Sequence, residues 1–143
     1  MTLEEAQAIT QRWLSDAGVG PGQRVLDVGA GPGALTATLL ERVGPEGSVV
    51  GLDREETFLS LARTRHAGRA AVFHQVDLAG PLPDDLGTFD AIVGRRVLMY
   101  LPDPVATLTR LRALLTEAGF TDIEAPDVGD TAPGLFLTAR KGG

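Results

Sequence analysis

A glycine-rich turn directly after a short apolar strand limits this 143-residue chain to a small group of folds. Residues 24–28 read RVLDV, and residues 29–33 continue as GAGPG. Glycine permits a tight turn and lets a ligand approach the backbone, and the helix expected from Ala34 presents free N–H groups at its start. Such a strand–turn–helix unit is typical of parallel α/β sheets, in which ligands bind beyond the carboxyl ends of the strands.

Strand and helix patterns alternate along most of the chain. Apolar runs predict strands at residues 24–28, 48–52, 70–76 and 89–93. Helical spacing predicts helices at residues 3–17, at 34–43, through 58–62, and from the N-cap Asp103 to Gly119. The first of these helices opens with an S/T-x-x-E capping box formed by Thr2 and Glu5.

The last part of the chain changes character. Residues 120–128 and 135–140 are two strand-like runs with a short connection, so we expect them to pair as an antiparallel hairpin beside the fourth strand. The sequence thus predicts a single domain over residues 1–143. Its predicted fold class is α/β, a Rossmann-like doubly wound sheet that is mainly parallel with an antiparallel C-terminal strand and is shortened to about six strands.

Composition limits the binding partners, the metal sites and the cellular location that this chain is expected to have. A formal net charge of −6 disfavours nucleic acid and anionic membranes, since binding to both relies on basic patches. Cysteine is absent, which excludes disulfides and thiolate metal sites. His66, expected on an exposed helix face, and His74, expected in a strand, lack acidic partners at metal-ligand spacing, so no metal site is expected. With no signal peptide and no apolar run of roughly 20 residues, a cytoplasmic domain is expected.

An acidic residue at the end of the second strand complements the glycine turn. Asp53 follows Gly33 by about 20 positions, where a carboxylate can accept hydrogen bonds from ribose hydroxyls. Turn and acid together indicate an adenosine-type ligand. Because Gly29, Gly31 and Ala34 satisfy the dinucleotide pattern G-x-G-x-x-G/A, a nicotinamide or flavin cofactor is an alternative.

Two residues of the turn favour a ligand without a pyrophosphate. Asp27 directly precedes the glycines, where its carboxylate would attract an ammonium group and repel a pyrophosphate. Pro32 removes one N–H from the loop that could otherwise bind phosphate.

Several stretches resemble the class I S-adenosylmethionine-dependent methyltransferases. Residues 25–33 are similar to the first motif of that family, residues 49–53 with 59–63 to the next, and residues 76–78 and 89–95 to the two that follow. Residues 97–104 are similar to its continuation into the next helix. The resemblance extends from Trp13 to Leu115, in the family's order, and it implies S-adenosylmethionine as the cofactor.

The resemblance also implies a cofactor site at the ends of the first four strands. Asp27 would hold the amino group, the glycine loop would line methionine and ribose, and Asp53 would bind the ribose hydroxyls. Adenine would contact Arg54, the Asp77 carboxylate and the Leu78 backbone. The implied site residues are Asp27, Gly29, Ala30, Gly31, Gly33, Asp53, Arg54, Asp77, Leu78, Gly94 and Arg95.

After Leu115 the chain departs from this family. The family's fifth strand and the segment that shapes its substrate pocket have no counterpart, so we interpret the sequence as truncated by an internal deletion. One helix would then take the place of two. The adenosine side of the expected pocket is complete, whereas the side that would bind the acceptor lacks a segment. An exposed apolar sheet edge would also favour a homodimer.

Three functions remain open from the sequence. The first is a methyltransferase domain with a small-molecule acceptor, for which no catalytic residue can be named, since Tyr100 and Asp103 near the pocket mouth have structural explanations. The second is an inactive cofactor-binding or structural remnant completed by a partner or a second copy. The third, a nicotinamide-dependent reductase, would need a Tyr/Lys pair, but the single tyrosine and Lys141 lie far apart in the sequence.

Overall fold

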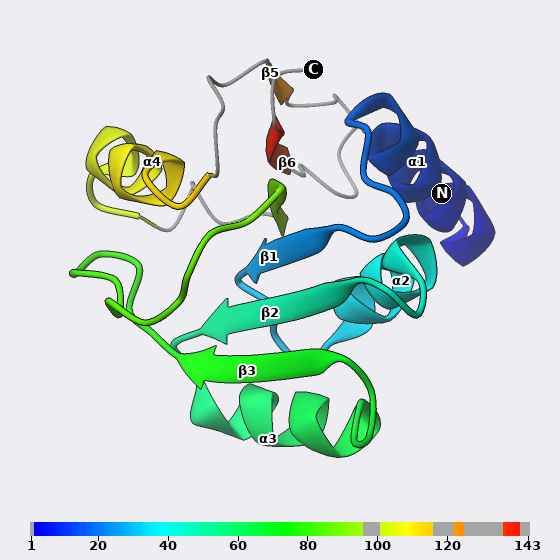
Figure 1. Cartoon of the computed structure of the whole chain (residues 1–143), viewed down its shortest axis with the longest axis horizontal. Coiled ribbons are helices and arrows are strands. Elements are labelled where there is room, and N and C mark those ends of the chain that lie inside the picture. Colours follow the sequence, from blue (N-terminus) through cyan, green and yellow to red (C-terminus); the bar gives the residue numbers. More distant parts are fainter. Residues whose placement is uncertain (1, 96–100, 116–121, 125–135, 141–143) are drawn as a thin grey trace.

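The structure, a computed structural model, describes residues 2–95, 101–115, 122–124 and 136–140 (Figure 1). Helices and strands alternate up to β3, as expected. The elements in chain order are α1 (Leu3–Asp16), β1 (Arg24–Val28), α2 (Ala34–Val43), β2 (Ser48–Asp53), α3 (Glu56–Arg65), β3 (Ala71–Gln75), β4 (Ala91–Arg95), α4 (Pro104–Arg112), β5 (Asp122–Glu124) and β6 (Phe136–Arg140).

The strands form one six-stranded sheet in the order β3-β2-β1-β4-β6-β5. Strands β3, β2, β1 and β4 are parallel, β6 runs antiparallel to β4, and β5 runs antiparallel to β6. The predicted fold class and the hairpin beside the fourth strand are therefore confirmed. Since β6 pairs with β4 from Ala91 to Arg95, the edge strands of the described sheet are β3 and β5.

Two large apolar clusters cover the two faces of the sheet, and a smaller third one is formed by Ala30, Leu59, Ala62 and Phe73. Successive residues of a strand point to opposite faces. Val25 of β1 accordingly belongs to one cluster with Trp13 of α1 and Leu39 of α2, whereas Leu26 belongs to the other with Leu111 of α4. Trp13 is buried and packs α1 against the sheet.

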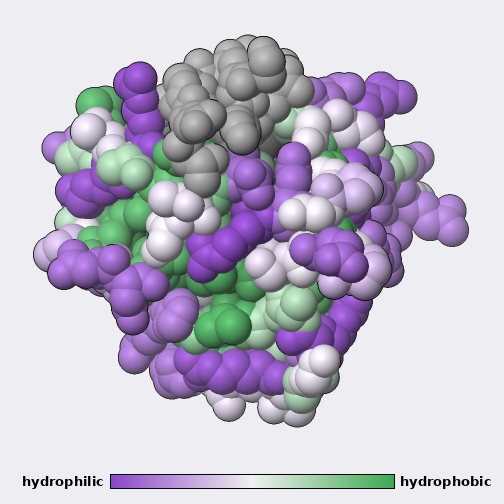
Figure 2. Space-filling model, in the orientation of Figure 1, coloured by the Kyte–Doolittle hydropathy of each residue, from purple (hydrophilic) through white to green (hydrophobic). Residues whose placement is uncertain are grey.

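The connection from β3 to β4 crosses the α4 side of the sheet without a helix. All of residues 76–90 are described, and they contribute Val76, Leu78, Leu86 and Phe89 to the apolar cluster on that side. A loop covers less surface than a helix, and Figure 2 shows hydrophobic residues reaching the surface between hydrophilic ones on this view of the molecule.

Helix starts follow the sequence closely. Thr2 and Glu5 form the expected capping box, in which each side chain accepts a hydrogen bond from the other residue's backbone N–H. Asp103 caps α4 by accepting from the Ala106 N–H, and Pro104 occupies the first position of the helix. None of the helices in the described ranges has the length and apolar character required to span a bilayer.

Two boundaries near the fourth strand differ from the prediction. Helix α4 ends at Arg112, not at Gly119, because the backbone after it turns toward the sheet, where the Leu114 carbonyl accepts from the Phe89 N–H at 2.8 Å. Leu115 forms an isolated parallel bridge with Phe89, so β4 itself begins at Ala91. This pairing overrides the helical periodicity of the sequence from Ala113 to Leu115.

Candidate functional site

The glycine loop lies at the carboxyl end of β1 and leads into α2. Gly29, Gly31 and Gly33 have φ angles of +72°, +56° and +92°, a region that strongly favours glycine. The N–H groups of Gly29 and Ala30 both donate to the Leu52 carbonyl, at 2.8 and 2.9 Å. These bonds fix the loop against β2, while a Cβ added at Gly31 would meet no atom within 4 Å. The loop is therefore rigid and open on the Gly31 side.

Asp53 lies beside this loop at the end of β2. Its Oδ2 accepts a hydrogen bond from the Gly31 N–H at 2.8 Å, and its Oδ1 accepts from the Glu55 N–H at 2.9 Å. Each carboxylate oxygen can accept more than one hydrogen bond, so both retain capacity for hydroxyl donors. The sequence-based pairing of Asp53 with the glycine loop is thus realised in the geometry.

Asp27 is a buried carboxylate directly beneath the loop. It is 1% exposed, and its Oδ2 accepts a hydrogen bond from the Thr36 hydroxyl at 2.7 Å. Its Oδ1 is buried and has no partner among the described residues. Burial raises the pKa of Asp27 to about 6; the Thr36 hydrogen bond opposes this shift and the charge of Asp53 adds to it. An unpaired buried carboxylate oxygen fits a cationic donor such as an ammonium group.

The loop after β3 lies next to the end of β2. The Val76 N–H donates to the Asp53 carbonyl at 2.9 Å. Asp77 follows, exposed, with its Oδ1 accepting from the Ala79 N–H at 2.9 Å. Leu78 is buried, and its carbonyl oxygen is bound by Thr107 and Arg110 of α4. The structure therefore brings Asp77 and Leu78 to the same edge of the sheet as Asp53.

The remaining predicted site residues have no described contact with the glycine loop or Asp53. Gly94 is buried in β4, where it pairs with Val28, and Arg95 ends that strand; both were expected just past the strand and lie within it. The Arg54 side chain is exposed and contacts Glu55, with no described contact to the glycine loop. Arg96 and Tyr100 lie outside the described residues, as does the side chain of Arg95.

His66 contradicts the expectation of an exposed helix residue. It is 3% exposed, its Nε2 donates to the Gly33 carbonyl at 2.9 Å, and its ring stacks on Phe73 with centroids 6.0 Å apart. The spacing of Leu59, Ala62 and His66, three and then four residues, places all three on the buried face of α3 and could have revealed this. His74 lies in β3 as expected.

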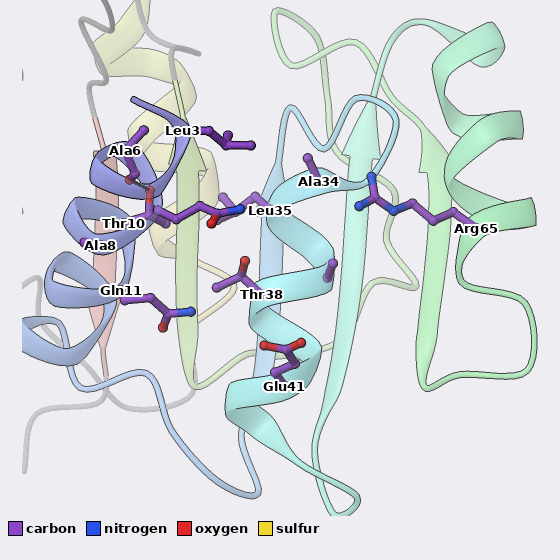
Figure 3. A pocket seen from close by; sticks show the side chains of 12 residues that line it. Leu3, Ala6, Ala8, Thr10, Gln11, Ala34, Leu35, Thr38, Glu41 and Arg65 are labelled. Atoms are coloured by element: carbon purple, nitrogen blue, oxygen red, sulfur yellow. Dashed lines mark hydrogen bonds between the residues drawn. The ribbon is translucent and has the colours of Figure 1, made fainter. Parts of the chain in front are cut away.

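A separate cavity of about 490 Å³ opens between α1 and α2 (Figure 3). Thr10 and Gln11 line it from α1, and Thr38 and Glu41 from α2. In Figure 3, Arg65 reaches from the end of α3 toward Ala34. No predicted cofactor residue lines this cavity, so it is distinct from the site at the glycine loop.

Comparison with known proteins agrees with this geometry. A family model described as a methyltransferase domain matches residues 20–136. A trans-aconitate 2-methyltransferase of Rhizobium etli is 35% identical over 73% of this chain and 39% of its own length. A demethylmenaquinone methyltransferase of Staphylococcus aureus is 29% identical over 83% of this chain and 49% of its own length. The chain thus spans less than half of either relative.

A solved structure shares both fold and sequence features. The S-adenosylmethionine-dependent methyltransferase from Mesorhizobium loti superposes with a TM-score of 0.60 and 28% identity, covering 71% of this chain and 45% of that protein. The family model covers the glycine loop, the strand β2 that ends at Asp53, and the loop after β3 that carries Asp77. The chain therefore belongs to the methyltransferase domain family, within the class I group whose cofactor is S-adenosylmethionine.

Proposed function

We propose that this chain is the cofactor-binding domain of a methyltransferase and that the edge formed by the ends of β1, β2, β3 and β4 binds S-adenosylmethionine. The observation that carries the proposal is the buried Asp27, whose Oδ1 lacks a partner among the described residues directly beneath the open glycine loop. An unpaired buried carboxylate is costly to the fold and is explained by a ligand that brings a positive charge.

Each part of the edge suits one part of the cofactor. Asp27 would accept from the ammonium group, and Gly29, Ala30, Gly31 and Gly33 would line the methionine and ribose. Asp53 would bind the ribose hydroxyls.

The adenine and methionine ends complete the proposed site. Asp77 would accept from the adenine amino group with Arg54 beside the ring, and Leu78 would offer its N–H, since its carbonyl is bound to α4. Gly94 and Arg95 would face the methionine end from β4.

When bound, S-adenosylmethionine supplies a methyl group made electrophilic by a sulfonium. The protein's contribution to such a transfer is chiefly alignment and exclusion of water. Here the rigid loop and the fixed Asp53 would hold the donor. We assign no general base.

We further propose a small organic acceptor and not a nucleic acid. The relatives named for trans-aconitate and demethylmenaquinone support this, as does the net charge of −6, which would repel a polyanion. The proposal also includes a cytoplasmic setting and a homodimer through the unpaired edge of β3. An inactive cofactor-binding remnant is the alternative, and it predicts binding without turnover.

Calorimetric titration with S-adenosylmethionine, S-adenosylhomocysteine and NADH tests the binding proposal. We expect saturable binding of the first two and none of NADH. Asp53→Ala should abolish binding, while Asp84→Ala, a change of an exposed acid in the β3–β4 loop, should leave it intact. Saturation by NADH alone, or full affinity in Asp53→Ala, would refute the proposed site.

A further inference from the structure

Helix α4 holds one peptide group of the loop after β3. The Leu78 carbonyl oxygen accepts from Thr107 Oγ1 at 3.0 Å and from Arg110 Nη2 at 2.9 Å. Arg110 Nη2 also donates to Thr107 Oγ1 at 3.2 Å, so the Thr107 hydroxyl hydrogen is directed at Leu78. Thr107 is 1% exposed, and a buried hydroxyl is costly to leave unpaired. The direction of the Leu78 carbonyl is therefore fixed from α4.

The other end of the same peptide group is bound to Asp77. This group joins the Leu78 carbonyl to the Ala79 N–H, which donates to Asp77 Oδ1 at 2.9 Å. Because a peptide group is planar, fixing its carbonyl also fixes the direction of its N–H. Asp77 is exposed, and its Oδ2 has no hydrogen-bond partner within the part of the chain that the structure describes. Helix α4 thus orients the Asp77 carboxylate through one intervening peptide.

This arrangement lies at the edge where the cofactor is expected. In Figure 1, α4 and the loop that leaves β3 both lie at the left, on the arrowhead side of the parallel strands. The Val76 N–H binds the Asp53 carbonyl, so the oriented Asp77 is adjacent to the ribose-binding acid. The contacts of Thr107 and Arg110 therefore act on the adenine side of the proposed site.

We propose that Thr107 and Arg110 are positioning residues that set the selectivity of this site for adenine. The inference rests on the proposed function, in which Asp77 accepts from the adenine amino group. Hypoxanthine carries a carbonyl oxygen at the position of that amino group. A carboxylate oxygen accepts hydrogen bonds and cannot donate them, so a well-oriented Asp77 favours adenine and repels hypoxanthine.

The test compares dissociation constants for S-adenosylhomocysteine and S-inosylhomocysteine, measured calorimetrically on the full chain. We expect the wild type to prefer the adenine compound by about tenfold or more. Thr107→Val and Arg110→Met should reduce this ratio by about fivefold, and Arg110→Lys, which keeps a charged donor, should restore part of it.

Thr109→Val is the matched control on the same helix. Thr109 is exposed and its hydroxyl donates to the Val105 carbonyl within α4, so its loss should leave the ratio unchanged. A purely structural role for Thr107 and Arg110 would weaken both ligands equally. An unchanged ratio in Thr107→Val and Arg110→Met would therefore overturn the inference.

Asp77→Asn gives an independent readout that does not touch the α4 core. An amide can donate to the hypoxanthine oxygen, so the preference should fall by about tenfold or reverse. An unchanged preference would overturn the inference, because Asp77 would not read the base. Failure of the wild type to bind either compound would refute the proposed function, and the inference with it. A wild-type preference for the adenine compound that the α4 variants leave unchanged would refute the inference but not the proposed function.

Discussion

Asp27 places an electrostatic cost in the core of the domain. Its carboxylate is buried, receives one hydrogen bond from Thr36, and has a second oxygen without a described partner. The folded state therefore favours the protonated form, and burial raises the pKa from 3.8 to about 6. Evolution of a stable fold alone would replace such a group, so its presence favours a ligand-binding role.

The stability of the unliganded domain should show this cost as a pH dependence. The pKa of Asp27 is higher in the folded chain than in the unfolded chain, so protonation of Asp27 stabilises the fold. This stabilisation is fully present below pH 3.8 and is lost as the pH rises through about 6. The change amounts to about 3 kcal/mol. Asp27→Asn should remove this component when free energies of unfolding are measured by urea denaturation between pH 4 and pH 7.5. Parallel pH profiles for the two proteins would contradict the assignment.

Gly31 and Gly33 offer a matched pair that separates binding from folding. A Cβ at Gly33 would lie 2.9 Å from His66 Nε2, whereas a Cβ at Gly31 would meet nothing within 4 Å. Both have positive φ, so Gly33→Ala should destabilise the fold by about 3 kcal/mol and Gly31→Ala by about 1 kcal/mol. Gly31→Ala should nevertheless abolish S-adenosylhomocysteine binding, because its methyl group occupies the open side of the loop.

Thermal unfolding and calorimetry on the same samples check this pair. Strong binding by Gly31→Ala would place the cofactor elsewhere. Equal stability of the two variants would show that the contact with His66 does not constrain the loop.

The sequence indicated the glycine loop and Asp53, but not the side chains that contact this region from the helices. The spacing between the glycine loop and Asp53 linked the two in the sequence, and a hydrogen bond from the Gly31 N–H to Asp53 joins them in the fold. Thr36 and His66 were not predicted as supports, since each acts on a residue that only the packing of a helix on the strands brings near. The family resemblance implied that Arg54 lies beside the adenine, and in the structure its side chain is exposed.

At the scale of elements, Arg42 joins α1 to α2. Its Nε donates to Gln11 Oε1 at 2.9 Å, and its Nη2 donates to Ser15 Oγ at 2.7 Å. Its Nη1 reaches the Val19 carbonyl at 3.2 Å, beyond the end of α1. One guanidinium thus bonds three points along α1 and its exit, next to the cavity between the two helices.

Arg42→Met should therefore loosen α1 selectively. We expect a loss of about 2 kcal/mol in the free energy of unfolding and faster amide hydrogen exchange in α1 than in β1. Arg65→Met, a change of an exposed arginine at the same cavity, is the control and should alter stability by less than about 0.5 kcal/mol. Uniform exchange in both helices and the sheet would show that Arg42 does not anchor α1.

The boundaries of elements were predictable where local chemistry decides them. The capping box at Thr2 and the Asp103–Pro104 start of α4 are local signals, and both are confirmed. The end of α4 depends on the pairing of Leu115 with Phe89, a contact between segments that no local pattern reports. Helical periodicity continued past Arg112 in the sequence, but the chain turns there to reach the sheet.

At the scale of the whole molecule, the two faces of the sheet are covered unequally. A helix precedes each of the strands β1, β2 and β3, whereas the crossing from β3 to β4 has no helix. Val72 of the edge strand β3 is 54% exposed as a result. An exposed apolar edge strand is a surface on which another sheet can pair.

Val72→Lys should reduce self-association without weakening the fold. A lysine on an edge strand opposes edge-to-edge pairing by charge repulsion. We expect a dimer fraction in the wild type at high concentration, measured by sedimentation velocity, that falls by about fivefold in Val72→Lys. Val105→Lys, which changes an equally apolar and 73% exposed residue of α4, should leave the distribution unchanged. Identical sedimentation of all three proteins would exclude the β3 edge as the contact.

The pairing of Leu115 with Phe89 also makes the architecture tolerant of length. The backbone is tied to the sheet there before it leaves for β5, and β4 is independently closed by β6 from Ala91 to Arg95. Additional residues placed between Leu115 and Asp122 need not disturb the register on either side. Insertions or deletions between Leu115 and Asp122 can therefore change the length of the chain while the ends of β1, β2 and β3, where we propose that the cofactor binds, stay unchanged.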